Sequence, residues 1–272
     1  MKRTILTGIL VVVAGCSALM AQKGNKNQQS QQQAPAQPAG PRVKSQEEAK
    51  AVNALIQSQT AGPDAIIKAA DDLLTRFADT EFKEIALTFE AEAYQKKGDF
   101  ARAEVIDEDI LKVNPKSYQA SLQLGELIVN HTGENDLDKA DKLAKVQKLL
   151  NQTIQDLKSA EKPANTQLTD EQWSGYKKAE TAQAQADLAR AALLDKKYDD
   201  AIAQFKAAGD TDPQPAYQAY LAMAYQKAGK NDEALAICSK ILSDPQTNPA
   251  IKGYVTNVQK AANAAKGAAA PK

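Results

Sequence analysis

Apolar and polar positions alternate along most of the chain with the spacing of amphipathic helices. The stretches "GDFARAEVIDEDILKVNP" (98–115), "KKYDDAIAQFKAAGDTDP" (196–213) and "GKNDEALAICSKILSDP" (229–245) carry small or apolar residues at matching places. Their clearest common member is an alanine near the start of each predicted helix, namely Ala103, Ala201 and Ala234. Residues three and four apart lie on one face of a helix, so each stretch predicts a helix that buries one side. A pattern that recurs in this way indicates an internal repeat.

Helix start and stop signals divide the chain from residue 45 to residue 265 into consecutive helix pairs. "SQEE" at 45–48 is a capping box that opens the first helix, and Gly62-Pro63 ends it. Gly98-Asp99 predicts the turn between the two helices of the next pair. Residues 248–265 predict a terminal capping helix. The sequence therefore predicts an all-α fold.

The repeated positions resemble the tetratricopeptide repeat, whose sparse pattern is an apolar residue, Gly or Ala and Tyr in the first helix, then Ala, Phe and Pro in the second. The first-helix matches are Leu87, Ala91, Tyr94, Gly125, Ala189, Ala222 and Tyr225. The second-helix matches are Ala103, Ala140, Ala201, Phe205 and Ala234. The resemblance implies a right-handed α-solenoid of about five degenerate helix pairs. In it, the small residues let helices approach and the tyrosines fill the gap to the next repeat.

The repeats are not evenly spaced. The interval from Ala140 to Ala201 exceeds the family period of about 34 residues by roughly 27, which predicts an insertion around residues 156–180. That insertion holds Trp173 and Tyr176, near the start of a long helix with a capping-type Thr169. We expect the two aromatic residues to cover the edge of the solenoid; the alternative is a pair that binds a partner.

The N-terminus reads as an export signal. Residues 1–21 begin with two basic residues, followed by an apolar run and small residues. "VAGC" at 13–16 resembles a bacterial lipobox, which makes Cys16 a candidate for lipidation; ordinary cleavage after Ala21 or an uncleaved anchor are the alternatives. Each of these places the folded part outside the cytoplasm, in the periplasm or envelope. Residues 22–44 predict a disordered Gln- and Pro-rich tether, and residues 266–272 a disordered tail.

Composition narrows the classes of partner and chemistry. The chain has 34 Lys+Arg and 34 Asp+Glu, so it lacks the basic excess that nucleic-acid binding requires. Cys238 has no intrachain partner once Cys16 is removed or acylated, and its helical apolar context predicts a core residue. His131 has no neighbouring Cys or His for a metal site. The acidic run 134–141 lacks the glycine and final glutamate of a calcium loop.

Tetratricopeptide arrays, as the resemblance implies, bind peptides or protein surfaces in the groove lined by the first helix of each repeat. By repeat register the groove residues are Thr88, Glu92, Gln95, Gln119, Leu122, Glu126, Arg190, Met223 and Gln226. Glutamates stand at two places where carboxylate-clamping members of the family carry asparagine, which favours a basic or mixed partner.

We therefore expect an extracytoplasmic adaptor that binds a protein or peptide, without a cofactor and without nucleic acid. The alternative is a self-associating structural scaffold. An enzyme is the third class, and no set of residues in the sequence suggests the chemistry for one.

Overall fold

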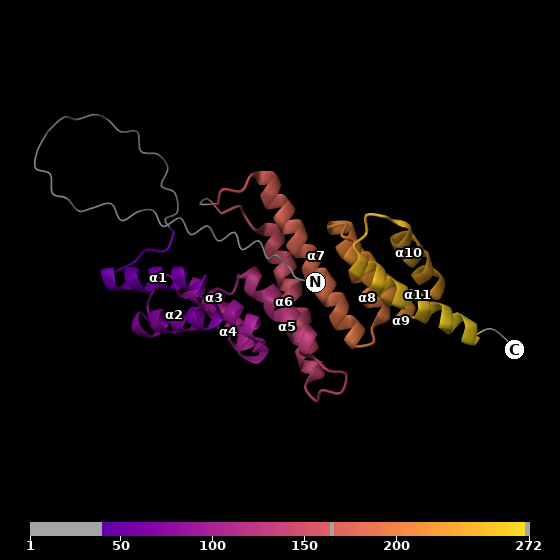
Figure 1. Cartoon of the computed structure of the whole chain (residues 1–272), viewed down its shortest axis with the longest axis horizontal. Coiled ribbons are helices and arrows are strands. Elements are labelled where there is room, and N and C mark those ends of the chain that lie inside the picture. Colours follow the sequence, from indigo (N-terminus) through magenta and orange to yellow (C-terminus); the bar gives the residue numbers. More distant parts are fainter. Residues whose placement is uncertain (1–39, 164–165, 270–272) are drawn as a thin grey trace, which may run out of the picture.

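The computed structural model describes residues 40–163 and 166–269, and within them the chain forms helices and no strand (Figure 1). In chain order they are α1 Gln46–Ser58, α2 Pro63–Arg76, α3 Lys83–Lys97, α4 Phe100–Val113, α5 Tyr118–His131, α6 Lys139–Ser159, α7 Asp170–Leu194, α8 Tyr198–Thr211, α9 Pro215–Lys227, α10 Asn231–Ser243 and α11 Pro249–Ala269. The predicted signal segment with its lipobox and nearly all of the predicted tether lie outside the described residues.

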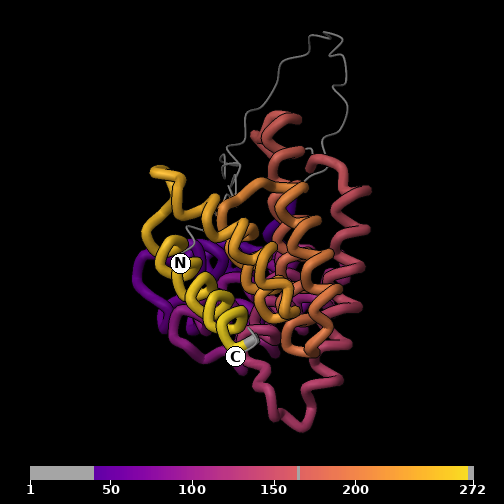
Figure 2. The backbone as a smooth tube through the Cα atoms, turned by 90° about the vertical axis from the view of Figure 1, so that its right-hand side faces the viewer, coloured from indigo at the N-terminus to yellow at the C-terminus, as the bar shows by residue number. Residues whose placement is uncertain are grey.

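Consecutive helices pack as antiparallel pairs, and each pair packs on the next (Figures 1 and 2). The pairs are α1–α2, α3–α4, α5–α6, α7–α8 and α9–α10, and α11 closes the row against α9 and α10. A single helix pair cannot bury its apolar face, so stacking completes the core. The prediction of an all-α solenoid is confirmed.

Much of the extra length of the long interval extends α6 and α7, while residues 160–163 and 166–169 between them are not helical. α6 has 21 residues and α7 has 25, against 13 to 15 for α1 to α5 and α8 to α10. The hairpin of α6 and α7 reaches beyond the neighbouring pairs (Figure 2). At the other end, α11 continues to Ala269, so the first four residues of the predicted tail are helical.

Small residues lie where two helices of a pair meet. Ala91, Ala189 and Ala222 in the first helices have no exposed surface, and neither do Ala103, Ala201 and Ala234 in the second helices. Gly125 shows why the contact needs them: a Cβ atom there would lie 2.8 Å from Leu150 Cδ2. Leu87, Tyr94 and Phe205 are buried in the same way, and Tyr225 is half-buried.

Ala140 is an exception, and its assignment to the packing set is wrong. It is exposed in the first turn of α6. The apolar stripe that packs α6 against α5 begins one turn later, at Leu143, and continues through Val146 and Leu150. Because α6 starts ahead of the region that faces α5, the alanine nearest its beginning points to solvent.

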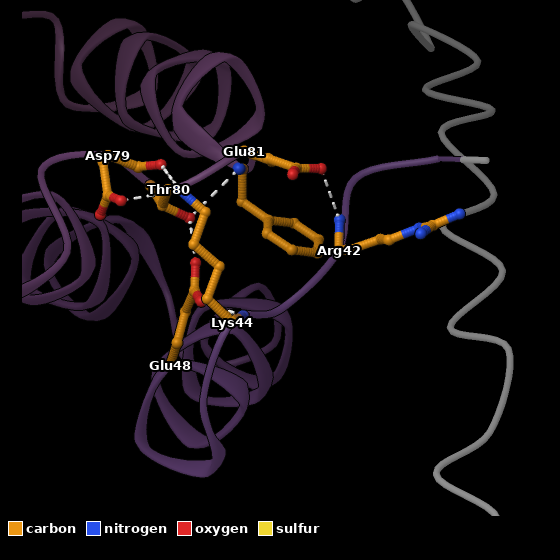
Figure 3. Close-up of polar contacts among 7 residues, drawn as sticks. Arg42, Lys44, Glu48, Asp79, Thr80 and Glu81 are labelled. Atoms are coloured by element: carbon orange, nitrogen blue, oxygen red, sulfur yellow. Dashed lines mark hydrogen bonds and ion pairs between the residues drawn. The ribbon is translucent and has the colours of Figure 1, made fainter. Parts of the chain in front are cut away.

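The chain enters the solenoid through a set of polar contacts that we call the N-terminal clasp, formed by Arg42, Lys44, Glu48 and the α2–α3 loop (Figure 3). The Arg42 backbone N–H donates to Glu81 at 2.9 Å, and the Lys44 ammonium donates to the Asp79 carboxylate at 2.8 Å. Glu48, which is buried, accepts from the Thr80 hydroxyl at 2.7 Å and from the backbone N–H of Lys44. The last residues of the predicted tether are therefore fixed to the α2–α3 loop.

Candidate partner-binding groove

The residues predicted to line a groove lie on the first helices of their pairs. Thr88, Glu92 and Gln95 are on α3; Gln119, Leu122 and Glu126 on α5; Arg190 on α7; Met223 and Gln226 on α9. Leu122 is buried in the core, and the others are half-buried. The structure defines the surroundings of two groups within the set, one around Arg190 and one on α3.

A hydrogen-bonded network joins the first group across α5 and α7. The buried Asp187 carboxylate accepts from Arg190 Nη1 at 3.0 Å and from Gln183 Nε2 at 2.6 Å. Arg190 Nη2 donates to Asn130 on α5. Burial raises the pKa of Asp187 to about 6, the positive charge of Arg190 opposes the rise, and the nearby Glu126 charge adds to it. The network holds the Arg190 guanidinium in one position between the two helices.

Beside this network the surface is hollowed to a volume of about 340 Å³. The hollow is lined by Val129, Glu134, Arg190, Leu193, Leu194, Lys196, Tyr198, Met223 and Lys227. Its size is at the lower end of the range for small-ligand sites, which suits one or two inserted side chains rather than a whole molecule. Apolar residues from α5, α7 and α9 share it with charged groups, as in sites where a few polar groups orient an apolar anchor.

Two of the residues predicted from the sequence, Arg190 and Met223, line this hollow. Met223 Sδ accepts from the Tyr254 hydroxyl at 2.8 Å, which links α9 to α11. Sequence reasoning missed Glu134, Lys196 and Lys227, since these come from a loop, a turn and a helix end that are far apart in the chain. The only sequence signal for Lys196 was that it stands where the other turns have glycine.

The second group lies on α3 and contains Glu92 and Gln95. Glu92 Oε1 and Gln95 Nε2 are buried without a hydrogen-bond partner. Burial raises the pKa of Glu92. No lining residue of the hollow belongs to α3. Thr88, on the same helix, donates its hydroxyl to the Glu84 carbonyl at 2.8 Å.

Next to Glu92, α4 carries a buried carboxyl group at Asp107. Its side chain has no exposed surface, and neither oxygen has a hydrogen-bond partner. Burial raises its pKa to about 8, with smaller contributions from Glu104 and Glu92. Asp107 lies four residues after Ala103, and the corresponding residues after Ala201 and Ala234 are Phe205 and Cys238, both fully buried.

Around Asp107 the local core falls into two small clusters, and Ile106 packs against both of them. One small cluster contains Leu87, Ala91, Ile110 and Ala120, and a second contains Tyr94, Ala103 and Leu127. In the α7–α8 pair, where Phe205 holds the same place, one larger cluster spans the helices. Asp107 is thus an internal weak point of the α3–α4 pair rather than part of an accessible site.

The aromatic residues of the long hairpin point inward. Trp173 is buried and stacks on Tyr176 with ring centroids 5.5 Å apart, and Tyr176 meets Tyr118 of α5 edge-on at 6.1 Å. Lys177 donates to the Ala160 carbonyl at 3.1 Å. This placement favours a role in covering the solenoid edge over the alternative of a partner-binding pair.

The remaining candidate residues have structural surroundings. His131 lies against the Phe100 ring, with centroids 4.2 Å apart, and its Nδ1 contacts the Leu127 carbonyl at 2.8 Å. Cys238 is fully buried, and burial raises the pKa of its thiol.

Within residues 40–163 and 166–269, no three His, Cys, Asp or Glu side chains gather in a way that could hold a metal ion. In the same residues, no helix combines the length and apolar character needed to cross a membrane.

The comparisons with known proteins agree on the fold. The solved structure of "MamA 41-end" from Desulfovibrio magneticus RS-1 has a TM-score of 0.55 at 14% identity, covering 80% of this chain and 98% of that one. A second structure, of "MamA protein", has a TM-score of 0.53 at 16% identity, covering 72% and 90%. Curated protein sequences gave no significant match. The tetratricopeptide repeat family model matches residues 192–258, from the end of α7 into α11. With five stacked helix pairs and a closing helix, the described residues have the fold of a tetratricopeptide repeat solenoid, and residues 192–258 match that family's model.

Proposed function

We propose that the chain is an extracytoplasmic adaptor that binds a segment of another protein on the faces of α5, α7 and α9. The observation that carries the proposal is the hollow beside Arg190 and Met223, which combines apolar walls with a few charged groups. Solenoids of this kind bind along extended surfaces made by successive repeats. An anchoring side chain in a desolvated hollow supplies much of the binding energy in such interfaces.

The test is site-specific photocrosslinking in the producing cell. A photoreactive phenylalanine analogue at Met223 is expected to form a covalent adduct with a second protein. The matched control is the same analogue at Val105, which is 56% exposed on α4 and outside the hollow. Equal adducts at both positions, or none at Met223, would contradict the proposal. Adducts of twice the chain's own mass would instead support the self-associating scaffold.

The location of the adaptor is a separate proposal that rests on the N-terminal sequence. We expect Cys16→Ala to move the protein from the membrane to the soluble envelope fraction, because two acyl chains on one cysteine give stable anchoring. Mass spectrometry of the mature N-terminus checks the processing directly. A mature chain that begins at Gln22 would rule out lipidation and leave the adaptor proposal intact.

A further inference from the structure

The turn between α7 and α8 has a strained residue at its centre. Lys196 adopts φ 59°, in the left-handed region that L residues other than glycine rarely occupy. The turns between α3 and α4 and between α9 and α10 have Gly98 at φ 76° and Gly229 at φ 75° at the corresponding place. Glycine takes this conformation without a steric cost. The chain therefore tolerates strain at Lys196 that two of its own repeats avoid.

Backbone hydrogen bonds from Lys196 N to the Leu193 carbonyl at 3.1 Å and from Lys197 N to the Ala192 carbonyl at 2.9 Å close α7, as at the two glycine turns. They explain the left-handed conformation, but not why the residue is lysine. Its ammonium pairs with Glu134 at 2.8 Å, but the two side chains are 64% and 67% exposed. Ion pairs this exposed contribute little to stability, since water screens the charges and ordering two long side chains costs entropy. Residues in strained conformations cluster at functional sites, and here it is the lysine side chain, not the turn, that distinguishes this position from the two glycine turns.

Lys196 lies where two hollows meet. It lines the hollow beside Met223 and also a neighbouring one of about 360 Å³, together with Tyr198. In the first hollow, three cations, Arg190, Lys196 and Lys227, face a single anion, Glu134. The buried Asp187 carboxylate compensates the charge of Arg190, with which it forms an ion pair at 3.0 Å. The hollow thus keeps a positive excess beside its apolar wall.

We propose that this hollow binds an acidic side chain that stands next to an apolar one in a partner segment, with Lys196 as the residue that pairs with the acid. The proposal rests on the adaptor function and names its class of partner. The apolar residue inserts between Leu193 and Met223, and the acidic residue meets Lys196 and Lys227 at the rim. In the free protein the Glu134 carboxylate forms an ion pair with the Lys196 ammonium, so it competes with the acidic side chain of the partner.

The test begins with an array of short peptides of mixed sequence, each acetylated and amidated so that no terminal charge remains. The fluorescently labelled mature chain is expected to retain peptides in which Glu or Asp adjoins Leu, Ile or Phe, about tenfold above their Gln and Asn counterparts. A second array with free C-termini shows whether a terminal carboxylate replaces the side chain. Retention that depends on the free C-terminus, equal retention of neutral peptides, or no retention overturns the proposal.

Variants at Lys196 separate binding from stability. Lys196→Gly is expected to raise the melting temperature by about 2 °C through relief of strain, while retention of acidic peptides falls about tenfold. Lys196→Arg keeps the charge and should restore retention. Glu134→Gln should increase retention severalfold, because it removes the competing anion. Lys240→Asn, on the exposed face of α10, is the matched control and should change neither property.

The results of these variants distinguish a wrong assignment of Lys196 from a failure of the adaptor proposal. If Lys196→Gly leaves the retention of acidic peptides unchanged, the assignment of Lys196 is wrong. The crosslinks at Met223 would persist in that case, because they depend on the hollow and not on the sign of the partner's charge. Loss of both signals would indicate that the faces of α5, α7 and α9 do not bind a partner.

Discussion

Asp107→Leu is expected to raise the melting temperature, and the rise should be larger at alkaline than at acidic pH. The buried carboxyl keeps its proton in the folded chain until about pH 8, whereas its ordinary value is 3.8. Between these two pH values the folded state binds more protons than the unfolded state, so stability falls as the pH rises and levels off above about pH 8. Leucine removes this dependence and adds apolar contact between the two core clusters, which Ile106 already touches.

The expected gain from Asp107→Leu is on the order of 4 kcal/mol, or about 10 °C, near pH 8, and much less near pH 4. Thermal denaturation followed by circular dichroism across this range measures it. Asp107→Asn should flatten the same pH profile with a smaller gain, since the amide is still buried without a partner. Asp109→Asn is the control on the same helix, where the carboxylate pairs with Lys112 at 2.7 Å near the surface. A gain that does not change with pH would contradict the argument.

Phe205→Ala should destabilise the chain by about 3–5 kcal/mol, the usual cost of removing a buried aromatic side chain. Phe205 is fully buried on α8 and stacks on Tyr220 with ring centroids 5.7 Å apart. Because each repeat contacts only its neighbours, the loss should be local. Hydrogen exchange measured by mass spectrometry should accelerate in α7 to α9 and stay unchanged in α1 and α2.

Phe100→Ala provides the comparison, since this ring is 37% exposed at the start of α4. It should cost clearly less than Phe205→Ala because less apolar surface is lost from the core. Uniform acceleration of exchange along the whole chain after Phe205→Ala would show that the array unfolds as one unit.

The repeat pattern was sufficient to predict the helix pairs, because small residues such as Ala103 and Ala201 mark the place where two helices touch. It fails at Ala140, because the buried stripe of α6 begins at Leu143 and the alanine before it is exposed. Register could have identified Asp107, since the repeat pattern expects an aromatic residue where the chain has a carboxyl group.

The groove was harder to predict than the fold. Its hollow combines the end of α5, a loop, a turn and the end of α9, and their proximity depends on how three repeats stack. Arg190 and Met223 were found because they follow the periodicity of the first helices. Lys196 and Glu134 do not follow this periodicity, and the sequence marks Lys196 only by the glycines Gly98 and Gly229 at the corresponding place of two other turns.

The N-terminal clasp determines how a mechanical load would enter the molecule. A pull on the residues before Arg42 first reaches Arg42 and Lys44, and their contacts pass it to Asp79 and Glu81 in the α2–α3 loop. The load then bypasses α1 and α2, which lie between these points in the chain. As long as these contacts hold, tension applied from the N-terminal side would be borne by the loop, and the first repeat would stay packed on the array.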